Sequence, residues 1–393
     1  MSEPTDGTRS RQRVFIATVS VGAGHWSVAR ALVERFARDA PDIEVDCRDA
    51  LDFVPKAFRW YYRGMFVTGM VRLPGLYGLV YRLTDRPQRP ARGVMERFRL
   101  WVERLFLRRL RRHLLDTRPS LVLCTHFLPT PMIGRMIARG ELDSPQAVVV
   151  TDICVHRFWH SENVAHWFAP AESSAETLER WGHAPADVTV SGIPIHPKWT
   201  VPVDAAGTRA DFGLPDDRPV VILTAGTEFI CGPVKAIARD LLDACPDLHL
   251  VALAGRDDEL RVALEAMPEA GARMTVIGYT DRLHELVEVS RLVITKAGGV
   301  TTFECLAKGK PMVIPRPVPG HEAGNARHYA DHGAAVVVRN PREVAARVRE
   351  LLASPSRLDA MADAAGQLHR PGARTVVRYA TETLGTGKGD TKA

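Results

Sequence analysis

The hydrophobic positions of this chain gather in short runs, separated by longer stretches with helical periodicity. Apolar runs predict strands at 14–19, 121–124, 147–150, 166–169 and 188–190. After a polar interval, a second series predicts strands at 220–224, 248–254, 274–277, 292–295, 311–315 and 334–338. Runs that are apolar at every position are typical of parallel strands covered on both faces. The pattern therefore predicts an α/β protein.

The interval at 197–219, which contains Pro202, Gly207 and Pro215, is predicted to be a linker between two domains. We expect two doubly wound, Rossmann-like domains, 11–200 and 201–384, facing each other across a cleft. The polar segment 385–393 is expected to be a disordered tail. Because such sheets bind ligands beyond the carboxyl ends of their strands, the site is expected in the cleft.

Composition narrows the class of protein. The chain has 393 residues, of which 46% are hydrophobic and 25% charged, so it is neither fibrous nor wholly disordered. Its six cysteines form no C-x-x-C pair, which argues against a zinc ribbon and favours a reducing cytoplasm. No apolar run reaches the roughly 18 residues of a membrane span, and no signal peptide precedes the first strand. Any membrane contact is expected at the surface.

Charge is concentrated in one region. Between Phe53 and His113 there are fifteen basic residues and three acidic ones, a net charge of +12, whereas the whole chain carries +6. The segment 53–83 is also rich in aromatic residues, and 98–110 has the pattern of a basic amphipathic helix. Both are predicted to lie on an anionic membrane surface through six residues: Trp60, Tyr61, Trp101, Arg108, Arg109 and Arg112. A core helix with extended arginines is the alternative.

The first motif that carries chemistry is Gly22-Ala-Gly24-His25, between the first strand and a helix. Glycines let the backbone approach a ligand, and a histidine at such a turn suits general-base chemistry near pH 7. The motif is no P-loop, because no Gly-Lys-Ser/Thr follows. It is also an incomplete dinucleotide fingerprint, with no clear acid at the end of the second strand.

The second motif runs from Ile294 to Pro311. A strand leads into Gly298-Gly299, and Thr301 lies in the first turn of the helix that follows, where amides and the helix dipole attract a diphosphate. Glu304 lies one turn further on and could accept hydrogen bonds from both hydroxyls of a ribose.

Further polar groups follow other strands. The proline-rich loop 316–326 contains His321, Glu322 and Asn325, which are suited to sugar hydroxyls. In the first half, Thr125-His126 and Thr151-Asp152 follow successive strands, and Trp159 comes soon after. The repetition favours a common cleft, although Asp152 could equally be a turn cap.

In these motifs the sequence resembles the GT-B glycosyltransferases that use UDP-sugars. It is most similar to the monogalactosyldiacylglycerol synthase and processive diacylglycerol glucosyltransferase family, in glycosyltransferase family 28. Five segments match in order: the Gly22 turn, Thr125-His126, 150–152 with Trp159, 191–195, and 295–325.

The resemblance implies roles for individual residues. His25 would be the base, with Asp152 as a candidate assistant, and the acceptor would lie near Gly22, Gly24, His126 and Trp159. A UDP-sugar donor would be held by Gly226, Gly278, Tyr279, Gly298, Gly299, Thr301, Glu304, His321, Glu322 and Asn325. His321 stands where the family commonly has glutamine, so the hexose is left open.

The implied reaction is inverting transfer of a hexose from a UDP-sugar to a lipid hydroxyl, by default that of diacylglycerol, at the cytoplasmic face of a membrane. No Asp-x-Asp motif is present, so no metal and no cofactor are expected. Two alternatives stay open: a soluble glycosyltransferase with a non-lipid acceptor, and a nucleic-acid-binding protein using the basic segment. The second lacks any known recognition module, so no nucleic acid is expected as a partner.

Overall fold

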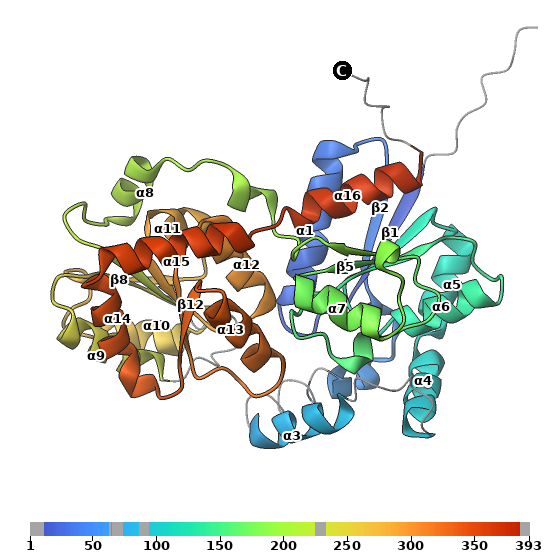
Figure 1. Ribbon diagram of the computed structural model, residues 1–393, viewed down its shortest axis with the longest axis horizontal. Coiled ribbons are helices and arrows are strands. Elements are labelled where there is room, and N and C mark those ends of the chain that lie inside the picture. Colours follow the sequence, from blue (N-terminus) through green and yellow to red (C-terminus); the bar gives the residue numbers. More distant parts are fainter. Residues whose placement is uncertain (1–11, 63, 65–73, 86–93, 225–232, 386–393) are drawn as a thin grey trace, which may run out of the picture.

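The computed structural model describes residues 12–62, 64, 74–85, 94–224 and 233–385. Figure 1 shows two lobes side by side, each built on a sheet with helices packed on both faces. The predicted fold class, two doubly wound α/β domains, is therefore confirmed.

The first sheet has six parallel strands in the order β2-β1-β3-β4-β5-β6. Its strands are β1 (Arg13–Thr18), β2 (Glu44–Asp49), β3 (Leu121–Cys124), β4 (Gln146–Val149), β5 (His166–Ala169) and β6 (Val188–Val190). Strand β2 was not predicted, because it lies at the sheet edge and alternates polar with apolar residues instead of forming an apolar run. The order reverses between β1 and β3, and ligands of such sheets bind at this reversal.

The second sheet has the order β12-β11-β10-β7-β8-β9, also with parallel pairing throughout. Its strands are β7 (Val220–Thr224), β8 (His249–Gly255), β9 (Met274–Gly278), β10 (Leu292–Ile294), β11 (Met312–Pro315) and β12 (Ala335–Val338). This is the strand order of dinucleotide-binding folds, with its reversal between β7 and β10.

Helices connect the strands. Those of the first half are α1 (Gly24–Asp39), a helical stretch at 56–62, α3 (Pro74–Thr84), α4 (Val94–Phe106), α5 (Arg108–Thr117), α6 (Thr130–Ala138) and α7 (Glu172–Arg180). Those of the second half are α8 (Ala205–Phe212), α9 (Val234–Ala244), α10 (Asp258–Glu265), α11 (Leu283–Val289), α12 (Gly299–Ala307), α13 (His321–Asp331), α14 (Val344–Leu352), α15 (Pro355–Leu368) and α16 (Gly372–Thr383). Short 3-10 turns are η1 (Ala50–Phe53), η2 (Arg157–Trp159), η3 (Pro185–Asp187), η4 (Pro197–Thr200) and η6 (Pro341–Glu343).

Both faces of the sheets are buried, which explains the uninterrupted apolar runs. In β1, Val14 and Ile16 join one core cluster, whereas Phe15 and Ala17 join another on the opposite face. The cluster that contains Val14 continues into the second lobe, so the two halves share part of one core.

Two predictions about the domain boundary need correction. The predicted linker is partly structured, because η4 and α8 occupy it and α8 packs against α11. Helix α16, which the predicted range 201–384 assigns to the second domain, packs on α1 of the first, and its Tyr379 ring stacks on His166 with ring centroids 4.5 Å apart. Residues 386–393 of the predicted tail lie outside the described residues.

The chain passes between the lobes twice, and the two passages cross at glycines. A Cβ on Gly372 would lie 2.7 Å from the carbonyl oxygen of Gly192, and Gly192 has a φ of 76°. A side chain at either position would separate the two passages, so the lobes are joined here by backbone-to-backbone packing.

Candidate functional site

His25 lies at the reversal of the first sheet. It is the second residue of α1, and its Nδ1 lies 2.8 Å from the carbonyl oxygen of Thr125, which follows β3. The Thr151 hydroxyl oxygen, after β4, lies 3.0 Å from the same nitrogen. Three strand ends therefore meet at this one imidazole.

These contacts fix which nitrogen of the neutral His25 ring carries the proton. A carbonyl oxygen can only accept a hydrogen bond, so Nδ1 carries the proton and Nε2 of the neutral ring keeps its lone pair. Burial lowers the pKa of His25 below its usual value; the carboxylate of Asp152 and the Thr125 carbonyl oppose this effect, and His321 adds to it. His25 is thus neutral at pH 7 and can accept a proton at Nε2.

The side chains around His25 are mostly buried. His126 is 3% exposed, and its ring centroid lies 4.5 Å from that of His25 in an edge-on arrangement. Trp159 is 2% exposed, with its centroid 6.2 Å from His25. Both were predicted to contact the acceptor; in the structure they pack near His25 and have little surface exposed.

The glycine turn before α1 is held by an acid at the end of β2, which the sequence pattern did not reveal. Gly22 has a φ of 71°, which requires glycine. Asp49, at the end of β2, accepts hydrogen bonds from the hydroxyl of Ser20 and from the backbone N–H of Leu51. An acid therefore does stand at the end of the second strand, but it is engaged in holding the turn and capping η1.

The N-terminus of α12 lies at the reversal of the second sheet, directly after β10. Gly298 precedes the helix, and no side chain caps the first turn. The Thr302 hydroxyl bonds inward, to the carbonyl oxygen of Gly298 at 2.6 Å and to the Tyr329 hydroxyl at 2.7 Å. Thr301, by contrast, is partly exposed. The backbone amides of the first turn are thus arranged to receive an anion.

The two reversals touch each other. A Cβ on Gly299 would overlap the carbonyl oxygen of Thr151, and a Cβ on Gly24 would meet Val300 at 3.7 Å. Gly299 is therefore needed for contact between the lobes. At Gly298 a Cβ would meet only the Lys296 side chain, at 3.5 Å, so protein packing alone does not require glycine there.

Glu304 lies in the second turn of α12, partly exposed. Burial raises its pKa to about 7, against the opposing effects of Lys198 and a hydrogen bond with the Trp199 side chain, both from η4. A carboxylate with a pKa near 7 is poorly solvated. Such a group is suited to accept hydrogen bonds from a bound ligand.

Residues 316–321 run into α13, which begins at His321; we call them the donor loop after the role proposed for them below. Glu322 is 2% exposed; its carboxylate accepts from the backbone N–H of Val318 at 3.3 Å and lies 3.6 Å from Nζ of Lys296. Asn325 is fully buried, and its Oδ1 accepts from the backbone N–H of Ile153 at 3.1 Å. Asn325 thus links α13 to the segment just after Asp152.

Of the remaining predicted donor residues, Gly278 ends β9 and Tyr279 is 64% exposed, with the Arg256 guanidinium 4.6 Å from its ring centroid. Gly226 lies outside the described residues.

Sequence reasoning missed several groups at this site. Lys296, beside Glu322, lies within the second motif but was given no role there. Lys198 and Trp199, beside Glu304, come from η4, which has no motif of its own. A lysine directly after a strand and next to a glycine turn is the signal that could have identified Lys296.

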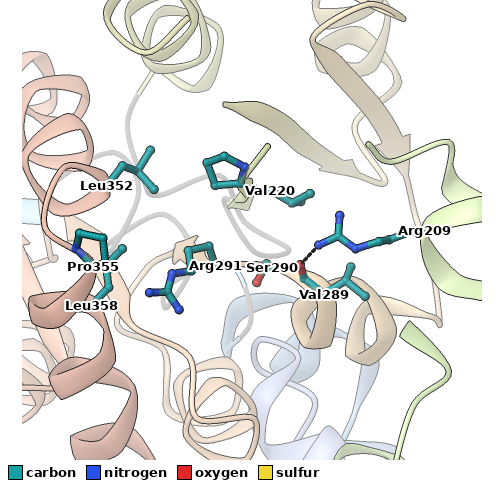
Figure 2. Close-up of a pocket in the computed structure, with 9 residues that line it drawn as sticks. Arg209, Val220, Val289, Ser290, Arg291, Leu352, Pro355 and Leu358 are labelled. Carbon is teal, nitrogen blue, oxygen red and sulfur yellow. Dashed lines mark hydrogen bonds between the residues drawn. The ribbon is translucent and has the colours of Figure 1, made fainter. Parts of the chain in front are cut away.

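The cavity in Figure 2 lies elsewhere, at the amino end of β7. It has a volume of about 220 Å³, and Figure 2 shows Arg209 pointing toward the carbonyl group of Val289, 3.2 Å from its Nη2. Ligands of parallel sheets bind at the opposite edge.

The basic segment forms two helices where one was predicted. The helix is interrupted at Leu107, between α4 and α5. Leu107, Leu110 and Leu114 are fully buried. Helix α5 therefore follows the core-helix alternative, with Arg108, Arg109 and Arg112 exposed on its outer side.

Apolar side chains are exposed on the neighbouring elements. We define the apolar surface as eight of them, from the 56–62 stretch, α3 and α4: Trp60, Tyr61, Leu76, Leu79, Val80, Leu83, Trp101 and Leu105. Trp60 is 79% exposed and Trp101 58%. In Figure 1, α3 and α4 both extend from the lower side of the molecule. Among the described residues, no helix is long and apolar enough to cross a membrane.

Comparison with known proteins identifies two regions. Residues 25–195 match the family model for monogalactosyldiacylglycerol synthase, and residues 224–376 match that for the glycosyltransferase family 28 C-terminal domain. A processive diacylglycerol beta-glucosyltransferase of Bacillus subtilis is 27% identical over 94% of this chain and 94% of its own length. That of Bacillus mycoides is 26% identical over 91% and 90%.

Solved structures share the fold. MurG of Acinetobacter baumannii has a TM-score of 0.58 at 14% identity, covering 94% of this chain and 99% of its own. The UDP-GlcNAc 2-epimerase of Neisseria meningitidis bound to UDP-GlcNAc has a TM-score of 0.60 at 15% identity, covering 94% and 100%.

Proposed function

This chain belongs to the glycosyltransferase family of monogalactosyldiacylglycerol synthase, with a family 28 C-terminal domain, and from that premise we propose that it transfers a hexose from a UDP-sugar to a membrane lipid hydroxyl. The acceptor proposed is diacylglycerol, the lipid in the names of the Bacillus relatives. The product would be a β-glycoside formed by inversion, at the cytoplasmic face of the membrane.

One observation carries the proposal: the contact between the two sheet reversals. Gly299, at the open end of α12, packs on Thr151, whose hydroxyl lies 3.0 Å from Nδ1 of His25. A proton acceptor and an anion-binding helix end are therefore neighbours. Transfer from a sugar diphosphate needs this pair, because the acceptor hydroxyl loses a proton while the diphosphate gains charge.

In the proposed mechanism, Nε2 of His25 takes the proton of the acceptor hydroxyl as its oxygen attacks the anomeric carbon. The bond from that carbon to the diphosphate breaks at the same time, and UDP leaves with the electron pair. The amides at the start of α12 would stabilise the diphosphate. Asp152, which raises the pKa of His25, would stabilise the imidazolium that forms.

The donor would lie along the second lobe. Glu304 would accept hydrogen bonds from the ribose hydroxyls, and Tyr279 with Gly278 would flank the uracil at the end of β9. Lys296, held beside Glu322, would add positive charge near the diphosphate. Support comes from the Neisseria epimerase, a protein of the same fold whose structure is bound to UDP-GlcNAc.

The apolar surface supports a lipid acceptor. The exposed tryptophans and leucines of the apolar surface lie within the segment 53–113, whose net charge is +12, and this combination suits an anionic bilayer. A soluble acceptor would need no such surface.

The deciding experiment measures UDP release from a panel of UDP-hexoses, with and without diacylglycerol in anionic liposomes. Release from one donor that depends on diacylglycerol supports the proposal, and mass spectrometry of the lipid identifies the product. UDP release that is independent of diacylglycerol would favour a soluble acceptor instead of the lipid. His25→Ala should lower the rate of transfer by about 10²–10⁴-fold. His332→Ala, which changes an exposed histidine just after the C-terminal end of α13, is the matched control.

A further inference from the structure

Helix α3 has two faces with different surroundings. Leu76, Leu79, Val80 and Leu83 form part of the apolar surface and are 46–58% exposed. Gly78, on the other side, is buried. The helix therefore has one face toward solvent and one toward the protein.

The inner face of α3 packs on the donor loop, which comes from the other lobe. A Cβ on Gly78 would lie 2.5 Å from Cβ of Pro319, so only glycine allows this approach. The Tyr81 ring centroid lies 6.3 Å from that of His321. His321 in turn is close enough to His25 to lower its pKa.

The same face also holds the loop that carries Asp152. The Tyr81 hydroxyl donates to the carbonyl oxygen of Cys154 at 3.3 Å, and its ring lies 4.3 Å from that of His156, centroid to centroid. The Thr84 hydroxyl lies 3.2 Å from Nε2 of His156. Helix α3 thus touches a loop from each lobe, beside the site where the two lobes meet.

We propose that α3 couples lipid binding to donor binding, with Gly78 and Tyr81 as positioning residues. A bilayer that holds the outer face of α3 fixes the inner face against Pro319 and His321, so part of the entropy cost of ordering the donor loop is met before UDP arrives. By linkage, bound UDP raises the affinity for the bilayer by the same factor. This inference rests on the proposed function, because it takes the donor loop to contact the UDP-sugar.

The test compares two alanine substitutions on one helix. Gly78→Ala inserts a methyl group against Pro319, whereas at Gly75 a Cβ would have nothing within 4 Å. Both changes replace a glycine of the same helix by alanine, which is the better helix former by up to about 1 kcal/mol in a helix interior. Binding of UDP is measured by calorimetry, without vesicles and with vesicles of phosphatidylglycerol and phosphatidylcholine that lack diacylglycerol. Vesicle flotation shows whether each variant binds lipid.

We expect vesicles to tighten UDP binding of the wild type and of Gly75→Ala by at least about fivefold, the lower range of couplings between sites. Gly78→Ala should float with vesicles but lose the gain. Tyr81→Ala should also lose it, and Tyr81→Phe, which keeps the ring beside His321, should recover most of it.

Equal UDP affinity of the wild type with and without vesicles would overturn the coupling, as would an equal gain in both glycine variants. If the wild type binds no UDP in either condition, the proposed function fails as well. If it binds UDP and transfers hexose while the gain is absent, only the coupling fails.

Discussion

The raised pKa of Glu304 gives a prediction in which binding and stability change in opposite directions. If Glu304 must be ionised to accept the ribose hydroxyls, donor affinity should fall about tenfold per pH unit below its pKa of about 7. At pH 5 roughly one molecule in a hundred has Glu304 ionised. Glu304→Gln should remove this pH dependence.

The size of the effect follows from the hydrogen bonds. Each bond to a charged group contributes about 1.5–3 kcal/mol, and Gln keeps one acceptor oxygen but loses the charge. We expect a loss of about 3 kcal/mol above pH 8, on the order of a hundredfold in Kd.

Stability should respond with the opposite sign. The pKa of Glu304 is higher in the folded chain than the usual 4.5, so ionisation costs folding free energy progressively between pH 4.5 and about 7. Above pH 7 the cost is of order 3 kcal/mol, and Glu304→Gln, which cannot ionise, should raise the free energy of unfolding there. At pH 4 the two proteins should be nearly equal.

The assay is calorimetric titration with a UDP-hexose from pH 5 to 8.5, paired with thermal unfolding at each pH. A UDP-hexose is preferred to UDP because its diphosphate has no terminal phosphate group that titrates near pH 6. A pH slope that survives in Glu304→Gln, or a lower stability of this variant at pH 8, would refute the reasoning.

Three other outcomes are expected. His25→Ala should lower kcat by about 10²–10⁴-fold with donor affinity unchanged, and because its pKa is lowered, wild-type kcat should begin to fall only below pH 6.5; a limb above pH 7 would point to another base. Gly298→Ala should keep the wild-type Tm but weaken UDP binding, whereas Gly299→Ala, which overlaps Thr151, should lower Tm; equal Tm values would contradict the lobe contact. Replacing the four exposed α5 arginines, Arg108, Arg109, Arg111 and Arg112, by Gln should reduce flotation with anionic but not neutral vesicles, and unchanged flotation would exclude α5 from the lipid contact.

Local pattern was sufficient for most of the fold. Strands buried on both faces are apolar at every position, so eleven of the twelve strands in the described residues stood out as runs. Strand β2 did not stand out, because an edge strand with one solvent-exposed face needs apolar residues only at alternate positions. The boundary was harder, since η4 and α8 lie in a proline-bearing interval and α16 returns to the first lobe only through tertiary packing.

The candidate site, like the fold, was predicted in part from local sequence pattern and in part depends on tertiary packing. The motifs identified His25 and Glu304 as chemically competent, because a histidine at a glycine turn and an acid in the first turns of a helix are legible locally. Some partners that act on their pKa values come from segments about a hundred residues away: Thr125 opposes the effect of burial on His25, and Trp199 opposes it on Glu304.

The sequence by itself determined eleven of the strands, the order in which the glycine turns follow them, and the candidate side chains for taking a proton or holding a ribose. Only the tertiary structure decided that Gly299 rests on Thr151, that His126 and Trp159 pack near His25, and that α3 reaches Pro319. The physical reason is the distance along the sequence over which each effect acts: periodicity and turn chemistry act over a few residues. Contacts between lobes depend on the shapes of surfaces that exist only after both sheets have formed.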